Sequence, residues 1–188
     1  MNELAGIEDI YELTALQQGM LFHSQYLHSS AVYTVQIDLG IGGALDRIAL
    51  EGAWAAVVAR HAALRTTFVW ERVERPYQLV HREVAAPVAW HDWSALDVAQ
   101  QAARRSAFIA DDNALPFDLQ RGPMVRLAVL VLGPVASRLV LTFHHILLEG
   151  WSTALVIGDL WQAYGAVAAG RPESMCHLEF ARRHIAQT

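Results

Sequence analysis

The chain of 188 residues contains no lysine, so all 14 of its basic residues are arginines. Aspartate and glutamate number 19, which gives a formal net charge of −5 at pH 7. Proteins that bind the phosphate backbone of nucleic acids concentrate positive charge on one face. The charge balance here therefore predicts no nucleic-acid partner.

Cysteine is almost absent as well: Cys176 is the single one, so no disulfide can form within the chain. This usage is typical of proteins in a reducing cytoplasm. Residues 1–9 are acidic, whereas a secretory signal peptide begins with basic residues and an apolar stretch. No apolar run reaches the ~20 residues that span a bilayer. We therefore expect a cytoplasmic protein without a membrane partner.

Hydrophobic residues make up 54% of the sequence and charged residues 18%, which is typical of a globular protein rather than a disordered one. The length suits one domain, or one large lobe, with a sizeable core. No internal repeat or low-complexity linker divides the chain.

Apolar side chains alternate in strands and recur every third or fourth residue in helices. By this criterion the predicted helices cover residues 15–26, 45–62, 95–110 and 152–169, with Thr14, Ser94 and Ser152 at their starts. The predicted strands cover residues 31–41, 66–71, 77–80, 88–91, 125–132 and 138–144. The helical side chains predicted to face the core are Leu16, Met20, Leu21, Leu50, Trp54, Val57, Val58, His61, Leu155, Leu160 and Tyr164.

Residues 143–152 join the end of a strand to the start of a helix through a short loop. Strand-to-helix loops are where open α/β sheets place their chemistry. Neighbouring side chains on a strand face opposite ways, so Thr142 and His144 share one face and His145 lies on the other. The two histidines therefore have different tasks. One is held in a wall by hydrogen bonds, and the other projects into the space beyond the strand end.

The pattern of two histidines, three residues, an acid and Gly-Trp-Ser resembles the signature of condensation domains of nonribosomal peptide synthetases. These domains belong among the chloramphenicol acetyltransferase-like acyltransferases, which share only the second histidine, the acid and the glycine. The family acid is aspartate, whereas this chain has a glutamate with one more methylene. The residues that carry the resemblance are His144, His145, Glu149, Gly150, Trp151 and Ser152.

Three further stretches resemble condensation-domain motifs: residues 13–24, 60–68 and 116–126. The first of them, together with the histidine motif, looks most like the subtype whose donor ends in a D-residue. In the second motif the family pairs its arginine with the acid of the histidine motif. The resemblance thus implies an ion pair between Arg65 and Glu149, although Arg65 taken alone is more typical of a solvated charge at an element junction.

The resemblance implies a mixed α/β (α+β) fold, in which helices flank a mixed sheet. Residues 1–188 are expected to form the N-terminal lobe of a condensation domain, and the second lobe of similar fold is missing. The implied reaction joins an upstream acyl or peptidyl thioester to the α-amine of a downstream aminoacyl thioester. Both substrates ride on phosphopantetheine arms of peptidyl carrier domains, so no cofactor binds directly. The implied partners are the donor and acceptor carriers, the missing C-terminal lobe and the adenylation domain of the module.

His145 is the predicted catalytic residue. An α-amine titrates near ~8 and a histidine near ~6.5, so His145 acts either as a base or as a positioning group, and both roles stay open. His144, Glu149, Gly150 and Arg65 are predicted to support it, and Trp151 and Ser152 to line the substrate channel. Because one lobe supplies one wall of a tunnel, we expect the isolated chain to fold and to be inactive.

Several alternatives compete with this interpretation. His144, His145 and Glu149 could bind a metal, but adjacent strand histidines diverge, so we predict no metal site. Cys176 lies far from every motif, which disfavours a cysteine nucleophile. A CoA-dependent acetyltransferase would lack the flanking motifs, and heterocyclising relatives carry aspartates in place of the histidines. An epimerising relative and a non-catalytic condensation-like binding module remain open.

Overall fold

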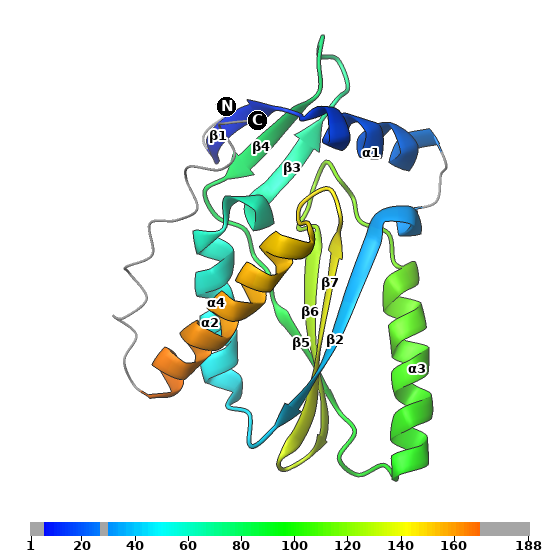
Figure 1. Ribbon diagram of the computed structural model, residues 1–188, viewed down its shortest axis with the longest axis vertical. Coiled ribbons are helices and arrows are strands. Elements are labelled where there is room, and N and C mark those ends of the chain that lie inside the picture. Colours follow the sequence, from blue (N-terminus) through cyan, green and yellow to red (C-terminus); the bar gives the residue numbers. More distant parts are fainter. Residues whose placement is uncertain (1–5, 27–29, 170–188) are drawn as a thin grey trace.

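The computed structural model describes residues 6–26 and 30–169 as two sheets with helices packed around them (Figure 1). Cys176 and the residues after the predicted end of the last helix at residue 169 lie outside these two ranges. In chain order the elements are β1 (Ile7–Glu12), α1 (Ala15–Tyr26), the 3-10 turn η1 (Ser30–Tyr33), β2 (Thr34–Gly42), α2 (Arg47–Arg60), the 3-10 turn η2 (Ala62–Arg65), β3 (Thr66–Val69), β4 (Tyr77–His81), β5 (Val88–Asp92), α3 (Val98–Ala114), β6 (Val125–Gly133), β7 (Ala136–His144) and α4 (Gly150–Ala168).

The larger sheet has the strand order β2-β7-β6-β5. Its first three strands are antiparallel neighbours, whereas β5 runs parallel to β6. Helices α2 and α4 pack together against one face, and α3 lies on the other side (Figure 1). The expected mixed sheet flanked by helices is confirmed. The main core forms where α2 and α4 meet the sheet, and it includes Leu50, Trp54, Val57, Leu139, Leu141, Phe143 and Leu160.

The amphipathic pattern predicts the buried side chains of α2 better than those of α4. Asp46 caps α2 by accepting the backbone N–H of Ala49 at 2.9 Å. In α4, Leu160 is buried, but Leu155 is 53% exposed because it points away from the face that carries Thr153 and Val156. The prediction that Leu155 faces the core was therefore wrong. Leu16 in α1 is likewise exposed, since the buried face of that helix is centred between Met20 and Leu21.

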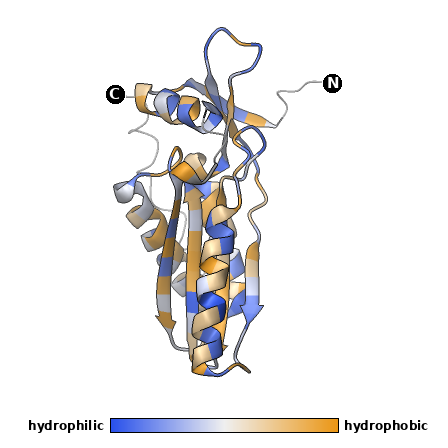
Figure 2. Ribbon diagram, turned by 90° about the vertical axis from the view of Figure 1, so that its right-hand side faces the viewer, coloured by the Kyte–Doolittle hydropathy of each residue, from blue (hydrophilic) through white to orange (hydrophobic). Residues whose placement is uncertain are grey.

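Helix α3 starts three residues later than predicted. Asp97, rather than Ser94, is its N-cap, and it exchanges hydrogen bonds with Gln100 in a capping box. Ser94 instead belongs to a turn, where its N–H is bound by Asp92 at 2.9 Å. Figure 2 looks onto α3, which lies in front of largely hydrophobic strands. No residue of α3 is fully buried.

The smaller sheet has the order β1-β4-β3 and lies at the end of the larger sheet where β7 finishes (Figure 1). Strand β1 escaped prediction because five of its six side chains are exposed, so no alternation marks it. Helix α1, this sheet and the loop after β7 share a second apolar cluster, which includes Met20, Leu21, Phe68, Phe117, Leu119, Met124 and Ile146. This cluster places α1 directly against the histidine loop.

None of the helices within the described ranges is long and apolar enough to cross a membrane.

Candidate active site

Both histidines sit where β7 ends. His144 is the last residue of β7, pairs with Thr34 of β2 and donates its backbone N–H to the carbonyl of Met124 at 3.1 Å. The backbone N–H of His145 is bound by the carbonyl of Tyr33 at 2.7 Å. A turn then closes between Leu147 and His144 before α4 begins at Gly150. Hydrogen bonds from both neighbouring strands and η1 therefore fix the backbone that carries the pair.

His144 is 2% exposed and forms part of a wall. Its Nδ1 accepts the backbone N–H of Ile146 at 3.2 Å, so the ring proton of the neutral form sits on Nε2. That nitrogen faces the Ser24 hydroxyl at 3.4 Å, and Ser24 donates its own proton to the Met20 carbonyl at 2.9 Å. Burial, and to a lesser extent the neighbouring His145, lowers the pKa of His144 to about 4. His144 is therefore neutral at pH 7.

His145 is half-buried and is held differently. Its Nδ1 lies 2.8 Å from the carbonyl oxygen of Leu148. A carbonyl can only accept, so Nδ1 must carry the proton in the neutral ring, and Nε2 keeps its lone pair. No protein partner of Nε2 is found within the described residues. A nitrogen of this kind can accept a proton or a hydrogen bond from a reacting group.

The acid of the motif caps the next helix. Glu149 is the N-cap of α4 and is exposed, and Ser152 accepts its backbone N–H at 2.8 Å. Ser152, predicted as the cap itself, thus lies at the third helical position. Thr153 donates its hydroxyl to the Glu149 carbonyl at 2.7 Å, which closes the first turn. Gly150 meets no neighbour where a Cβ would stand, and Trp151 is 82% exposed.

Arg65 does not pair with Glu149, so the ion pair implied by the resemblance is corrected. Its guanidinium is 2.7 Å from the carboxylate of Glu8 in β1 and also donates to the carbonyls of His81 and Arg82. Arg65 is 5% exposed, whereas Glu149 lies in solvent at the start of α4. Glu8 was missed because β1 itself was missed. The acid of the motif and the buried arginine therefore serve different contacts here.

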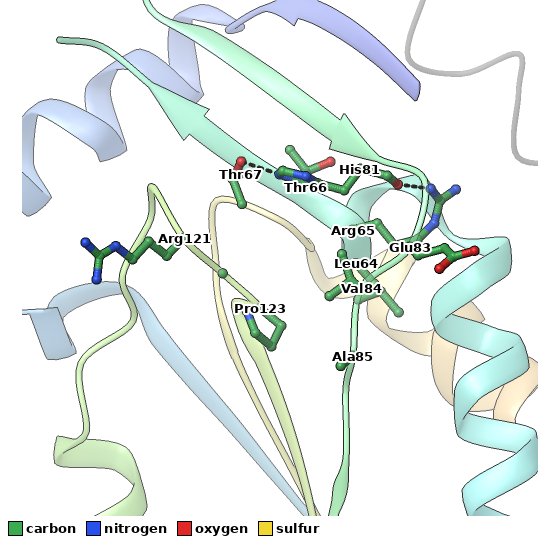
Figure 3. A pocket seen from close by; sticks show the side chains of 11 residues that line it. Leu64, Arg65, Thr66, Thr67, His81, Glu83, Val84, Ala85, Arg121 and Pro123 are labelled. Carbon is green, nitrogen blue, oxygen red and sulfur yellow. Dashed lines mark hydrogen bonds between the residues drawn. The ribbon is translucent and has the colours of Figure 1, made fainter. Parts of the chain in front are cut away.

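A cleft of about 270 Å³ opens between β3, β4 and residues 121–123. Figure 3 shows the stem of Arg65 in its wall and the guanidinium turned toward the His81 carbonyl. The Thr67 hydroxyl lies 2.7 Å from His81 Nε2. Burial first, and the charge of Arg65 second, lower the pKa of His81. A second cleft of about 250 Å³ has His144 and the aromatic rings of Trp70 and Phe117 in its lining.

A metal site would need ligating side chains that converge on one point. Nδ1 of His144 and Nδ1 of His145 are bound to different backbone groups, on opposite faces of the strand, so the two rings do not converge. Within residues 6–26 and 30–169, no three histidine, cysteine or acidic side chains come together in a metal-binding group.

Comparison with known proteins identifies the family. The family model described as "Condensation domain" matches residues 7–184. The chain belongs to the condensation-domain family. Among curated relatives, one of the linear gramicidin synthase proteins of Brevibacillus parabrevis is 39% identical over 171 residues, and another from the same organism is 41% identical over 180 residues. The matches cover 91% and 96% of this chain, but only 2% and 4% of those two synthase proteins.

Solved condensation domains share the fold. The starter condensation domain of rhizomide synthetase superposes with a TM-score of 0.82 at 23% identity, over 91% of this chain and 42% of that one. The first condensation domain of the calcium-dependent antibiotic synthetase, solved with a substrate analogue, gives 0.79 at 25% identity, over 88% and 41%. The chain thus spans under half of each of these structures. Its fold is confirmed as that of the N-terminal part of a condensation domain.

The new partner of Arg65 leads to a test of stability. We expect Arg65→Gln to lower the free energy of unfolding by about 3 kcal/mol, because Glu8 and two carbonyls lose a buried cation. Glu8→Gln should cost only about 1 kcal/mol, since Glu8 is partly exposed and Arg65 keeps its carbonyl acceptors. Urea unfolding of the single and double variants measures the coupling. Coupling of Arg65 to Glu149→Gln, and none to Glu8→Gln, would contradict the observed pairing.

The low pKa of His144 makes stability depend on pH. Between pH 4 and 6.5 the unfolded chain binds a proton that the folded chain excludes, so stability rises with pH across this window and is lost as pH falls. The full effect is roughly 3 kcal/mol. His144→Gln and His144→Asn should lack this part of the pH dependence. The measurement is the free energy of unfolding as a function of pH. Equal slopes for the wild-type chain and both variants would show that His144 titrates normally. His81 contributes equally to all three proteins and does not affect the comparison.

Proposed function

We propose that this chain supplies His144 and His145, which together form a histidine wall, to a site that forms peptide bonds between two carrier-bound substrates. The observation that carries the proposal is the orientation of His145, whose Nδ1–H is held by the Leu148 carbonyl and whose Nε2 stays available. The match of residues 7–184 to the condensation-domain family and the similarity to gramicidin synthases support it.

In the proposed reaction, the α-amine of the acceptor attacks the carbonyl of the donor thioester. A C–N bond forms, the C–S bond breaks, and the amine loses one proton while the thiol leaving group gains one. His145 Nε2 either takes that proton or orients the amine as it attacks. Because an α-amine titrates near ~8, an appreciable fraction is already neutral at pH 7, so positioning contributes in both cases. Because His144 is buried and neutral, it adds no second positive charge next to His145.

The partners follow from the same proposal. The donor and acceptor would arrive on phosphopantetheine arms of upstream and downstream peptidyl carrier domains, the acceptor having been loaded by the adenylation domain of the module. No cofactor is needed at the histidines themselves. A second lobe, in the part of the matched structures that this chain does not span, would close the tunnel and exclude water. Trp151, exposed on the first turn of α4 beside the loop, would line that tunnel.

A non-catalytic binding module is the second candidate. The observation in its favour is Glu149, which replaces the family aspartate and does not hold Arg65. Such a module would bind loaded carriers without joining their substrates.

The test is a single-turnover assay with both carriers loaded, performed on the complete condensation domain that includes this sequence. His145→Ala should slow amide formation by at least ~100-fold, because a positioned proton-transfer group contributes that much. His91→Ala, a histidine substitution on β5, is the matched control and should leave the rate unchanged. The 188-residue chain alone should form no amide.

Three outcomes separate the candidates. Unchanged turnover in a folded His145→Ala domain would contradict the assigned role. Carrier binding without amide from the wild-type domain would favour the binding module. Amide formation by the isolated chain at the rate of the complete domain would refute the requirement for a second lobe.

A further inference from the structure

Helix α3 is attached to the sheet through polar side chains as well as a few apolar ones. None of its residues is fully buried, and only Phe108 and Ile109 pack against the apolar cluster beneath them. Arg105, one turn earlier, is bound to Asp38 of β2 at 2.6 Å, and Asp38 also holds Arg138 of β7 at 2.5 Å. Asp112, one turn later, reaches the sheet close to the histidine loop. The helix therefore has polar attachments distant from the loop, through Gln101 and Arg105, and one near it, through Asp112.

The carboxylate of Asp112 joins three neighbouring strands. Its Oδ1 accepts from Arg126 Nε of β6 at 2.9 Å, and its Oδ2 accepts from the Gln36 amide of β2 at 2.8 Å. The hydroxyl of Thr142 in β7 donates to the same Oδ2. Thr142 is 1% exposed, so its hydroxyl has no solvent to replace this acceptor.

These three partners form one row across the sheet, because Gln36 and Arg126 both pair with Thr142. The next residue of β7 on the same face is His144. The guanidinium of Arg126 also covers the Phe117 ring at 4.0 Å, and that ring meets His144 edge-on at 6.5 Å. Asp112 thus fixes the row immediately below the histidine wall.

Helix α3 also lies beside the turn whose carbonyl holds the backbone of His145. Helix α3 lies beside η1 (Figure 1), and η1 ends at Tyr33, whose carbonyl binds the backbone N–H of His145 at 2.7 Å. The Tyr33 ring also packs on His144 with centroids 5.8 Å apart. The end of β7 is therefore braced both from the row below and from the turn beside it.

We propose that Asp112 is a positioning residue, which aligns the end of β7 so that His145 points at the reacting amine. The inference rests on the proposed function. Asp112 touches no reacting atom and acts through Thr142, Arg126 and the histidine wall. Loss of the Asp112 carboxylate would displace the end of β7 and misalign His145 with the reacting amine. The surfaces that bind the carriers would stay intact.

The test uses the complete domain and two substitutions at Thr142. Thr142→Val keeps the shape of the side chain but removes the hydroxyl, and we expect kcat to fall by about 10-fold to 100-fold, the usual cost of a misplaced group. KM for the loaded carriers should stay the same. Thr142→Ser keeps the hydroxyl and should retain most of the rate, although it loses a buried methyl group and with it some stability.

Asp112→Asn tests the acceptor itself and should reproduce the loss of kcat, and combining it with Thr142→Val should add little further loss. Arg105→Gln is the matched control. It breaks a distant attachment of the same helix, so it should lower thermal stability without changing kcat.

The result that overturns the proposal is a rate that follows stability alone, with Thr142→Ser slower than Thr142→Val, or Arg105→Gln as slow as Asp112→Asn. His145→Ala in the same series keeps the two proposals apart. If His145→Ala is slow and Thr142→Val is as fast as wild type, positioning by Asp112 fails and the proposed function stands. If His145→Ala is as fast as wild type, the proposed function itself fails.

Discussion

The hydrogen bond between His145 Nδ1 and the Leu148 carbonyl is the contact on which the site depends. It determines which ring nitrogen carries the proton and leaves the other one with its lone pair. The bond exists only because the loop turns back within three residues, between the end of β7 and the N-cap of α4. Both β7 and α4 pack into the main core, to which α2 also belongs. The chemistry at one nitrogen therefore depends on the packing of β7 and α4 into the main core.

The adjacent histidine provides the contrast. His144 sits on the opposite face of the same strand, where burial keeps it neutral and Ser24, Tyr33 and Phe117 surround it. The alternation of a β-strand is enough to give two identical side chains different environments. Asp112 adds a polar brace beneath that wall, and α1 adds an apolar cover above it.

The sequence predicted which residues form the site better than it predicted the partners of those residues. Periodicity and the doubled histidine located β7, the loop and α4, and the different environments of His144 and His145 followed from strand geometry. The Arg65–Glu149 pair was wrong because it was implied by family resemblance, while the actual partner, Glu8, lies on a short exposed edge strand without a pattern. The carbonyls of Leu148 and Tyr33 leave no trace in the sequence, since every residue has one. The network around Asp112 joins residues from four elements, so it emerges only once the strands are in register.

The most direct test of this account is the protonation pattern of the two imidazoles, read from nitrogen-15 correlation spectra of histidine-labelled protein at pH 7. The structure predicts opposite tautomers: a proton on Nδ1 of His145 and a proton on Nε2 of His144. A proton on Nε2 of neutral His145, with Nδ1 bare, would mean that the Leu148 carbonyl does not hold the ring and would contradict the role assigned to it.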